Sequence, residues 1–221
     1  MDALIVIGSV VLFLLIIILI VWISNASGKK RAKALNHVAS SLNLEFKDIA
    51  DNSMMALFRE FALFSNAVYP LGSGVMVGAF KEIYIIIADY KFRVSGTRLI
   101  PAQTIIIINS DSLQLPSFTL QPERLVQKIN LAVGYEKIDI DFDSHPDFSK
   151  RYLLQGPDEE KIRKFFKPEI IAYFEQHSRL CAEGDGNALL VFKQEHIVPP
   201  EEFRSFINKA LELYDLLKTR K

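Results

Sequence analysis

Residues 83–109 read IYIIIADYKFRVSGTRLIPAQTIIIIN, and this stretch decides the expected fold. Two runs, 83–94 and 99–109, are rich in Ile, Val and Tyr, and the turn residues Ser95-Gly96 lie between them. Both runs contain consecutive isoleucines, so they are typical of central strands that are covered on both faces. The short connection predicts antiparallel pairing, because a parallel crossover needs a dozen or more residues.

The flanking segments add further strands and helices. Strands are expected at 44–46, 75–80, 115–120 (at a sheet edge), 137–142 and 152–154, and a hairpin of 180–182 with 188–192 across Gly184-Asp185-Gly186. Helices are expected after the cap Asp51-Asn52-Ser53, running to Phe64, and after Pro122, Pro157, Pro168 and Pro200. The helix after Pro122 has Leu125, Ile129 and Val133 on one stripe. Strands and helices do not alternate regularly, which predicts an α+β fold with a mainly antiparallel sheet and packed helices.

The N-terminal residues 4–23, LIVIGSVVLFLLIIILIVWI, carry no charge and predict a transmembrane helix that has the lipid bilayer as its partner. A cleaved signal peptide is the alternative, with Ser24-Asn25-Ala26 as its cleavage site. No Lys or Arg precedes the run and its apolar core is long for a signal peptide, so the spanning helix is preferred.

Four basic residues follow this run: Lys29, Lys30, Arg31 and Lys33. The positive-inside rule then predicts that the N-terminus lies outside and that the folded domain lies in the cytoplasm. The same residues are candidate contacts for anionic headgroups at the membrane surface, although a role in topology is a sufficient reason for them.

The expected organisation is an anchor at 1–27, a basic juxtamembrane helix at 28–42 and a soluble α+β domain at 43–221, with a sub-boundary near 134–150 as an open alternative. The chain has 26 basic and 26 acidic residues, so its formal net charge is zero. Nucleic acid is therefore not an expected partner, because its recognition needs basic residues gathered on one face.

Cys181 is the single cysteine, which excludes an intramolecular disulfide and a zinc site made of several thiolates. As a nucleophile it would need His177 or His196 as its base. Its place between Leu180 and Ala182 in an apolar strand instead predicts a buried, inert thiol.

The most acidic segment contains Asp139, Asp141, Asp143, His145 and Asp147. Three of these carboxylates would share one face of a strand and would suit a hard cation. The spacing fails for a calcium loop of the helix–loop–helix type, since the sixth and twelfth positions from Asp139 are not Gly and Glu. A solvated strand face is preferred, and no metal or cofactor is predicted.

Three other groups have structural readings beside their functional ones. Asp158-Glu159-Glu160 resembles a set of catalytic acids but suits the first turn of a helix. Gly72-Ser73-Gly74 precedes a strand and not a helix, so it is a turn and not a phosphate cradle. Gln103-Thr104 and Asp89-Tyr90 would either line a site or complete hydrogen bonds at the end of buried strands.

The segments LPSFTLQPE (115–123) and DIDFDSHPDFSKRYLLQGPDEEKIRKFF (139–166) resemble a family of uncharacterised bacterial single-pass membrane proteins. These proteins share an N-terminal span, a Leu-Pro-x-Phe-x-Leu-x-Pro-Glu segment and a Phe-Ser-x-x-Tyr-x-Leu-x-Gly-x-Asp-Glu segment. The resemblance covers roughly residues 75–215. It implies a bacterial inner-membrane location and no particular activity.

Two functions are compatible with the sequence. The first is a membrane-tethered, non-catalytic binding or scaffold module, with a membrane protein, a peptide or a lipid as its ligand. It is preferred because no nucleophile, base or set of metal ligands converges in the sequence. The alternative is a membrane-anchored hydrolase that uses carboxylates around Asp139–Asp147 or Asp158–Glu160.

Overall fold

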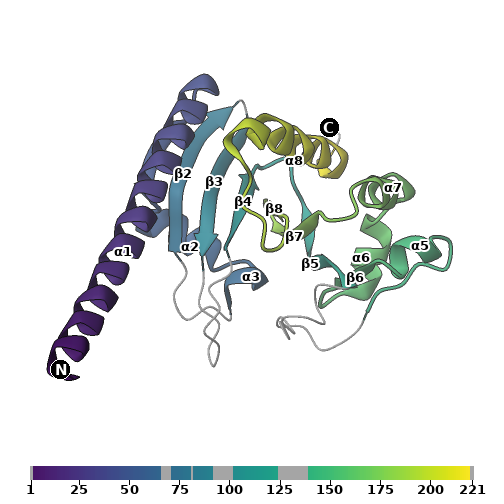
Figure 1. Ribbon diagram of the computed structural model, residues 1–221. Helices are drawn as coiled ribbons and strands as arrows, with labels where there is room; N and C mark the ends of the chain where they lie inside the picture. Colours follow the sequence, from purple (N-terminus) through teal and green to yellow (C-terminus); the bar gives the residue numbers. More distant parts are fainter. Residues whose placement is uncertain (1, 66–70, 81, 92–101, 124–138, 220–221) are drawn as a thin grey trace.

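Eight strands of the described chain form one antiparallel sheet (Figure 1). The computed structural model describes residues 2–65, 71–80, 82–91, 102–123 and 139–219. The spatial order of the strands is β1-β2-β3-β4-β8-β7-β5-β6. Their bounds are β1 Glu45–Ile49, β2 Leu71–Phe80, β3 Ile83–Lys91, β4 Ala102–Asn109, β5 Leu115–Pro122, β6 Tyr152–Gln155, β7 Cys181–Gly186 and β8 Ala188–Phe192. The predicted α+β class with antiparallel strands is confirmed.

The first half of the sheet is the predicted antiparallel meander, β1 to β4. In β3 and β4, Ile86 lies opposite Ile107, and Ile87 lies opposite Ile106. Ile87 and Ile106 belong to the larger of two hydrophobic clusters, and Ile86 and Ile107 belong to the smaller one. Because successive side chains of a strand point to opposite faces, both faces of the sheet are buried, as the isoleucine runs predicted.

The second half of the sheet differs from the prediction at β5. The expected edge position is wrong, because β5 pairs with β7 on one side and with β6 on the other. Its prolines stand where the ladder of hydrogen bonds is already interrupted. Pro116 lies within a register shift between Leu115 and Phe118, and Pro122 is the last residue of the strand. Bulges and strand ends are the places where a sheet tolerates proline.

Helices cover both faces of the sheet (Figure 1). The smaller cluster packs α2 (Asn52–Phe58) and α3 (Ala62–Ser65) against one face. The larger cluster includes residues from α1 (Asp2–Ser41), α5 (Pro146–Ser149), α6 (Glu159–Phe165), α7 (Pro168–Gln176) and α8 (Phe203–Leu217), the last preceded by the short η1 (Pro200–Glu202). The predicted cap of α2 is confirmed, since Asp51 accepts the backbone N–H groups of Ser53 and Met54. The single helix expected as far as Phe64 is split into α2 and α3, and the turn between them buries Phe61.

Helix α1 packs on the sheet through its C-terminal part. Leu35 and Ala39 are fully buried in the larger cluster. Gly74 of β2 allows this approach, because a Cβ atom there would lie 2.6 Å from the Leu35 Cδ1 atom. The φ angle of Gly74 is +58°, at a bulge of β2, so the Gly72-Ser73-Gly74 stretch serves a backbone bend inside a strand.

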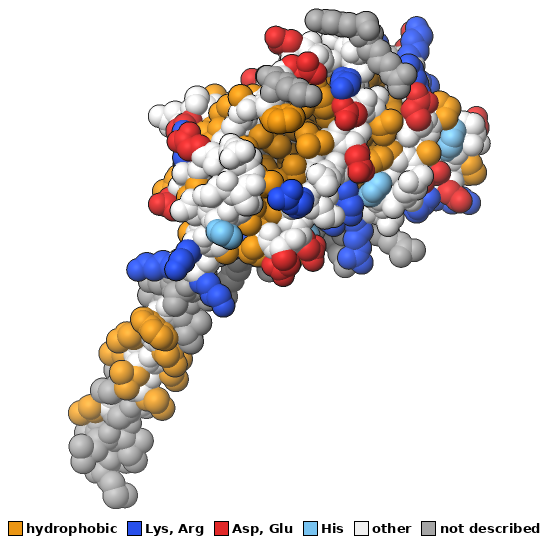
Figure 2. All heavy atoms as spheres, turned by 90° about the horizontal axis from the view of Figure 1, so that it is seen from above, with side chains coloured by type: hydrophobic (Ala, Val, Ile, Leu, Met, Phe, Trp, Pro, Cys, Tyr) orange, Lys and Arg blue, Asp and Glu red, His pale blue; other side chains and the backbone are white. Residues whose placement is uncertain are grey.

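The N-terminal half of α1 projects away from the folded body (Figure 2). Its described apolar side chains, from Ile7 to Trp22, are between 41% and 68% exposed. Within the described part of the chain, no helix is both long enough and apolar enough to cross a membrane. The predicted transmembrane helix at residues 4–23, and the single-pass assignment that rests on it, are corrected by this finding.

Two predicted elements concern residues 124–138, which lie outside the described part of the chain. They are the helix after Pro122 and the beginning of the strand at 137–142. The first residues of the possible domain sub-boundary near 134–150 also lie there. The described residues 139–142 are not a strand of the sheet. Ile140 nevertheless donates its N–H to the Leu154 carbonyl oxygen at 2.8 Å, so this segment runs beside β6 and is fixed to it.

Candidate functional site

The side chains of the acidic segment have separate partners in the structure. The Asp139 carboxylate accepts the Leu154 N–H at 3.3 Å, and burial raises its pKa, with a further contribution from the Asp141 carboxylate. Asp147 lies in the first turn of α5 and His145 bonds to the Ser144 hydroxyl. Among the described residues, no three His, Cys, Asp or Glu side chains come together as metal ligands.

The second acidic group has a structural role in α6. The Asp158 side chain caps this helix by accepting the Lys161 N–H at 3.0 Å, and that bond lowers the pKa of Asp158. Glu159 pairs with Arg163 one turn further along, at 2.7 Å. Glu160 pairs in the same way with Lys164, at 2.6 Å. Capping and pairing thus give each of the three carboxylates a structural partner within α6.

Cys181 is fully buried in β7, as the sequence predicted. Burial raises the pKa of its thiol to about 12. His177, one of the two bases considered for it, directs Nδ1 at the Tyr173 carbonyl oxygen at 2.8 Å and stacks on the Tyr173 ring. A buried neutral thiol of this kind is a poor nucleophile.

Of the four basic residues predicted at a membrane surface, Lys29, Lys30 and Lys33 are exposed on α1. Arg31 is not, and its guanidinium forms an ion pair with Asp89 of β3, with one N–H···O contact at 2.8 Å. The same guanidinium donates to the Val198 carbonyl oxygen at 3.1 Å. Sequence reasoning missed this pairing, because the two partners are 58 residues apart.

Thr104 completes what we call the Arg31 network, which consists of Arg31, Asp89, Thr104 and Val198. The Thr104 hydroxyl donates to Asp89 at 2.8 Å and accepts the Val198 N–H at 2.9 Å. The network joins α1, β3, β4 and the segment before α8. The polar residues at 89 and 104 therefore complete hydrogen bonds between buried elements, which was one of their two predicted roles.

Glu183 of β7 is a buried carboxylate that sequence reasoning did not single out. Its two oxygens both lie 3.1 Å from the Leu63 nitrogen, so the side chain caps the start of α3 from 120 residues away. Burial raises the pKa of Glu183 to about 7, and the bonds from Leu63 and Ala62 only partly oppose the rise. The one sequence signal is an acidic residue inside the apolar strand that contains Cys181.

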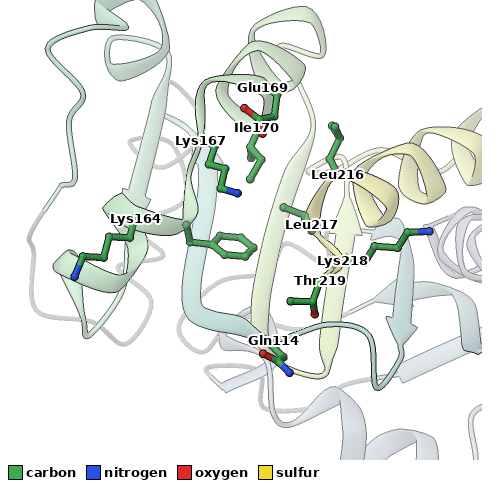
Figure 3. A pocket seen from close by; sticks show the side chains of 10 residues that line it. Gln114, Lys164, Lys167, Glu169, Ile170, Leu216, Leu217, Lys218 and Thr219 are labelled. Carbon is green, nitrogen blue, oxygen red and sulfur yellow. The ribbon is translucent and has the colours of Figure 1, made fainter. Parts of the chain in front are cut away.

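An open pocket of about 510 Å³ lies between α6, α7 and the end of α8 (Figure 3). We call it the α6–α8 pocket. Its apolar wall consists of Phe165, Ile170, Leu216 and Leu217. Its polar residues are Gln114, Lys164, Lys167, Glu169, Lys218 and Thr219. Its volume is in the range of about 300–1,000 Å³ that is usual for small-molecule sites.

The pocket is made where three helices meet. α6 ends at Phe165, α7 begins at Pro168, and α8 ends at Leu217. Pro168 predicts the first two of these boundaries, because it ends the preceding helix and begins the next one. That α8 ends beside them is a consequence of tertiary packing, and no sequence signal in α6 or α7 indicates it.

The comparisons with known proteins bear on the fold alone. No protein-family model and no curated protein matches the sequence. Thus the resemblance drawn from residues 115–123 and 139–166 stays a prediction. Those residues form β5, α5, β6 and α6, and Gly156 is required there because a Cβ atom would lie 2.4 Å from the Ser117 carbonyl oxygen.

A solved structure with a similar fold is the mycobacterial trehalose monomycolate transport factor A, TtfA. The TM-score is 0.57 and the sequence identity is 9%. The match covers 86% of this chain and 98% of TtfA, so it extends over nearly the whole α+β architecture described above.

Proposed function

We propose that this chain is a non-catalytic binding module and that the α6–α8 pocket is its ligand site. The observation that carries the proposal is the composition of this pocket. The pocket is open, and its lining combines an apolar wall of Phe165, Ile170 and Leu217 with six polar residues. Small-molecule sites are typically apolar hollows with a few polar groups that orient the ligand.

The fold of TtfA, which is named a transport factor, is compatible with a binding or scaffold role. The positions of the carboxylates that were considered for a hydrolase do not favour catalysis. Asp158, Glu159 and Glu160 are used in α6, and those from Asp139 to Asp147 do not converge. A general acid and a general base must both reach the reacting atoms, and these side chains are not placed to do so.

Hydrogen exchange of the full chain tests the proposal. A panel of small amphiphiles and short peptides is added, and at least one should protect backbone amides at 164–171 and 216–219. Leu216→Asp should abolish this protection, because it places a charge on the apolar rim, where Leu216 is 37% exposed. The matched control is Phe80→Asp at the end of β2, where the native ring is 64% exposed and does not line the pocket.

Turnover measurements provide the opposing result. Chromogenic esters and phosphoesters should be hydrolysed no faster by the wild-type chain than by Asp141→Asn or Glu159→Gln. Hydrolysis that disappears in either variant would establish the carboxylate hydrolase instead. Protection that is spread over the sheet, and not confined to the pocket, would contradict the assignment of the site.

A further inference from the structure

Two of the three lysines at the α6–α8 pocket have structural partners. Lys164 pairs with Glu160 at 2.6 Å, and Lys218 pairs with Asp215 at 2.6 Å. Both lysines also stand at the C-terminal ends of helices, where a cation offsets the partial negative charge of the helix. Figure 3 shows both side chains directed away from the centre of the pocket.

Lys167 is different. It is the residue before α7, its side chain makes no capping hydrogen bond, and no ion pair is formed by it among the described residues. Figure 3 shows its ammonium group directed into the hollow, toward the side where Ile170 and Leu217 lie. Lys167 therefore has no structural role in view, and its cation is placed next to an apolar wall.

We infer that the α6–α8 pocket takes a single-chain amphiphile with a monoanionic headgroup, which pairs with Lys167 while the alkyl chain lies against Phe165, Ile170 and Leu217. The inference rests on the proposed function and adds the ligand class. One ammonium group is a compact point charge that matches one negative charge, whereas phosphate dianions favour arginine forks or several cations.

Glu169 provides a second handle on the same charge. Its carboxylate lines the pocket two residues after Lys167 and stays exposed. A negative headgroup is attracted by Lys167 and repelled by Glu169. Neutralising Lys167 must therefore lower the affinity, and neutralising Glu169 must raise it. This pair of opposite effects is a signature that a purely apolar ligand would not produce.

A local reporter tests the inference in the full chain. Gln114→Cys places one exposed thiol in the lining, and Cys181 is too buried to compete for the label. An environment-sensitive dye on this thiol reports the pocket and ignores binding to the exposed apolar residues of α1. Decanoate, decyl phosphate, decanol and decyltrimethylammonium are titrated below their micelle concentrations, with amide exchange at 167–171 of the unlabelled chain as a second readout.

Decanoate should bind most tightly. Lys167→Gln should weaken it about fivefold and Glu169→Gln should strengthen it about twofold, which are typical sizes for single charges near a surface. Lys161→Gln removes an exposed cation of α6 that does not line the pocket, and it should leave the affinity unchanged. Raising the salt concentration should weaken decanoate binding to the wild type, because an open site is screened.

Three results would overturn the inference. If decanol and decanoate bound equally well, and Lys167→Gln changed neither affinity, the anionic headgroup would be disproved while the proposed binding function would still stand. A preference for decyl phosphate over decanoate would replace the monoanion by a phosphate. No effect of any probe on the reporter or on amide exchange would remove the ligand class and the proposed site together.

Discussion

On each face of the sheet a buried carboxylate binds a helix that packs there, and the two carboxylates have different partners. Asp89 holds α1 on the face of the larger cluster, through a guanidinium and a threonine hydroxyl. Glu183 holds α3 on the face of the smaller cluster, through the backbone N–H groups of Leu63 and Ala62. A buried charge with a cationic partner is compensated, whereas one that is bound only by backbone dipoles is driven toward its neutral form. The contact between Glu183 and α3 should therefore weaken as the pH rises toward neutrality.

The largest expected effect comes from removing the cation on the Asp89 side. Arg31→Ala removes the guanidinium from beside the Asp89 carboxylate, whose side chain is only 6% exposed, so it should lower the free energy of unfolding by about 3 kcal/mol. Urea denaturation at pH 7 measures this loss. Lys30→Ala, which removes an exposed cation from the neighbouring position, is the matched control and should cost less than about 0.5 kcal/mol. Equal losses in the two variants would show that the ion pair does not hold α1.

The next effect is the pH dependence on the Glu183 side. Its pKa is raised from 4.5 to about 7, so between these values the folded chain holds a proton that the unfolded chain has released. Stability must therefore fall as the pH rises from 4.5 through 7, by about 3 kcal/mol at most. Unfolding free energies measured at pH 5 and pH 8 should reveal this loss in the wild type.

Glu183→Gln keeps an acceptor for the Leu63 N–H and removes the titration. This variant should be less stable than the wild type at pH 5, and the difference should shrink or reverse at pH 8. Faster amide exchange at high pH should be found in 52–65 and not in 31–41 of α1, once intrinsic exchange rates are corrected. An unchanged pH slope in Glu183→Gln would mean that another group carries it.

The smallest effect concerns the hydroxyl within the Arg31 network. Thr104→Val removes a donor to Asp89 and an acceptor for the Val198 N–H, while the shape of the side chain is kept. The expected loss is about 1–2 kcal/mol, because the Val198 N–H stays buried without its acceptor. A double-mutant cycle with Arg31→Ala should give a non-zero coupling energy, since both residues bind the same carboxylate. Strict additivity would argue against a shared network.

The sequence was sufficient for what depends on local patterns. The isoleucine runs predicted central antiparallel strands, and Asp51 and the prolines at 157, 168 and 200 predicted where helices begin. It was insufficient where a residue acts through a distant partner. In the sequence, Arg31 is one of several cations in a basic cluster, and only the structure shows that Asp89 is its partner. Glu183 is an unexplained acidic residue in an apolar strand until the structure shows that it binds the start of α3. The edge assignment of β5 failed because proline usually marks an edge, and a bulge that shelters Pro116 cannot be read from the sequence.

The order of strands also dictates a sequence of events during synthesis. β4 needs β8 as its second neighbour, yet β8 ends at Phe192, about 80 residues after β4 ends at Asn109. At the usual elongation rates, β8 emerges roughly 4–16 s after β4. Throughout this interval the nascent meander presents the free edge of a strand with four consecutive isoleucines, the kind of edge that recruits other chains. The demand for chaperone protection should therefore be concentrated in this window of translation and should end when the β7–β8 hairpin closes the sheet.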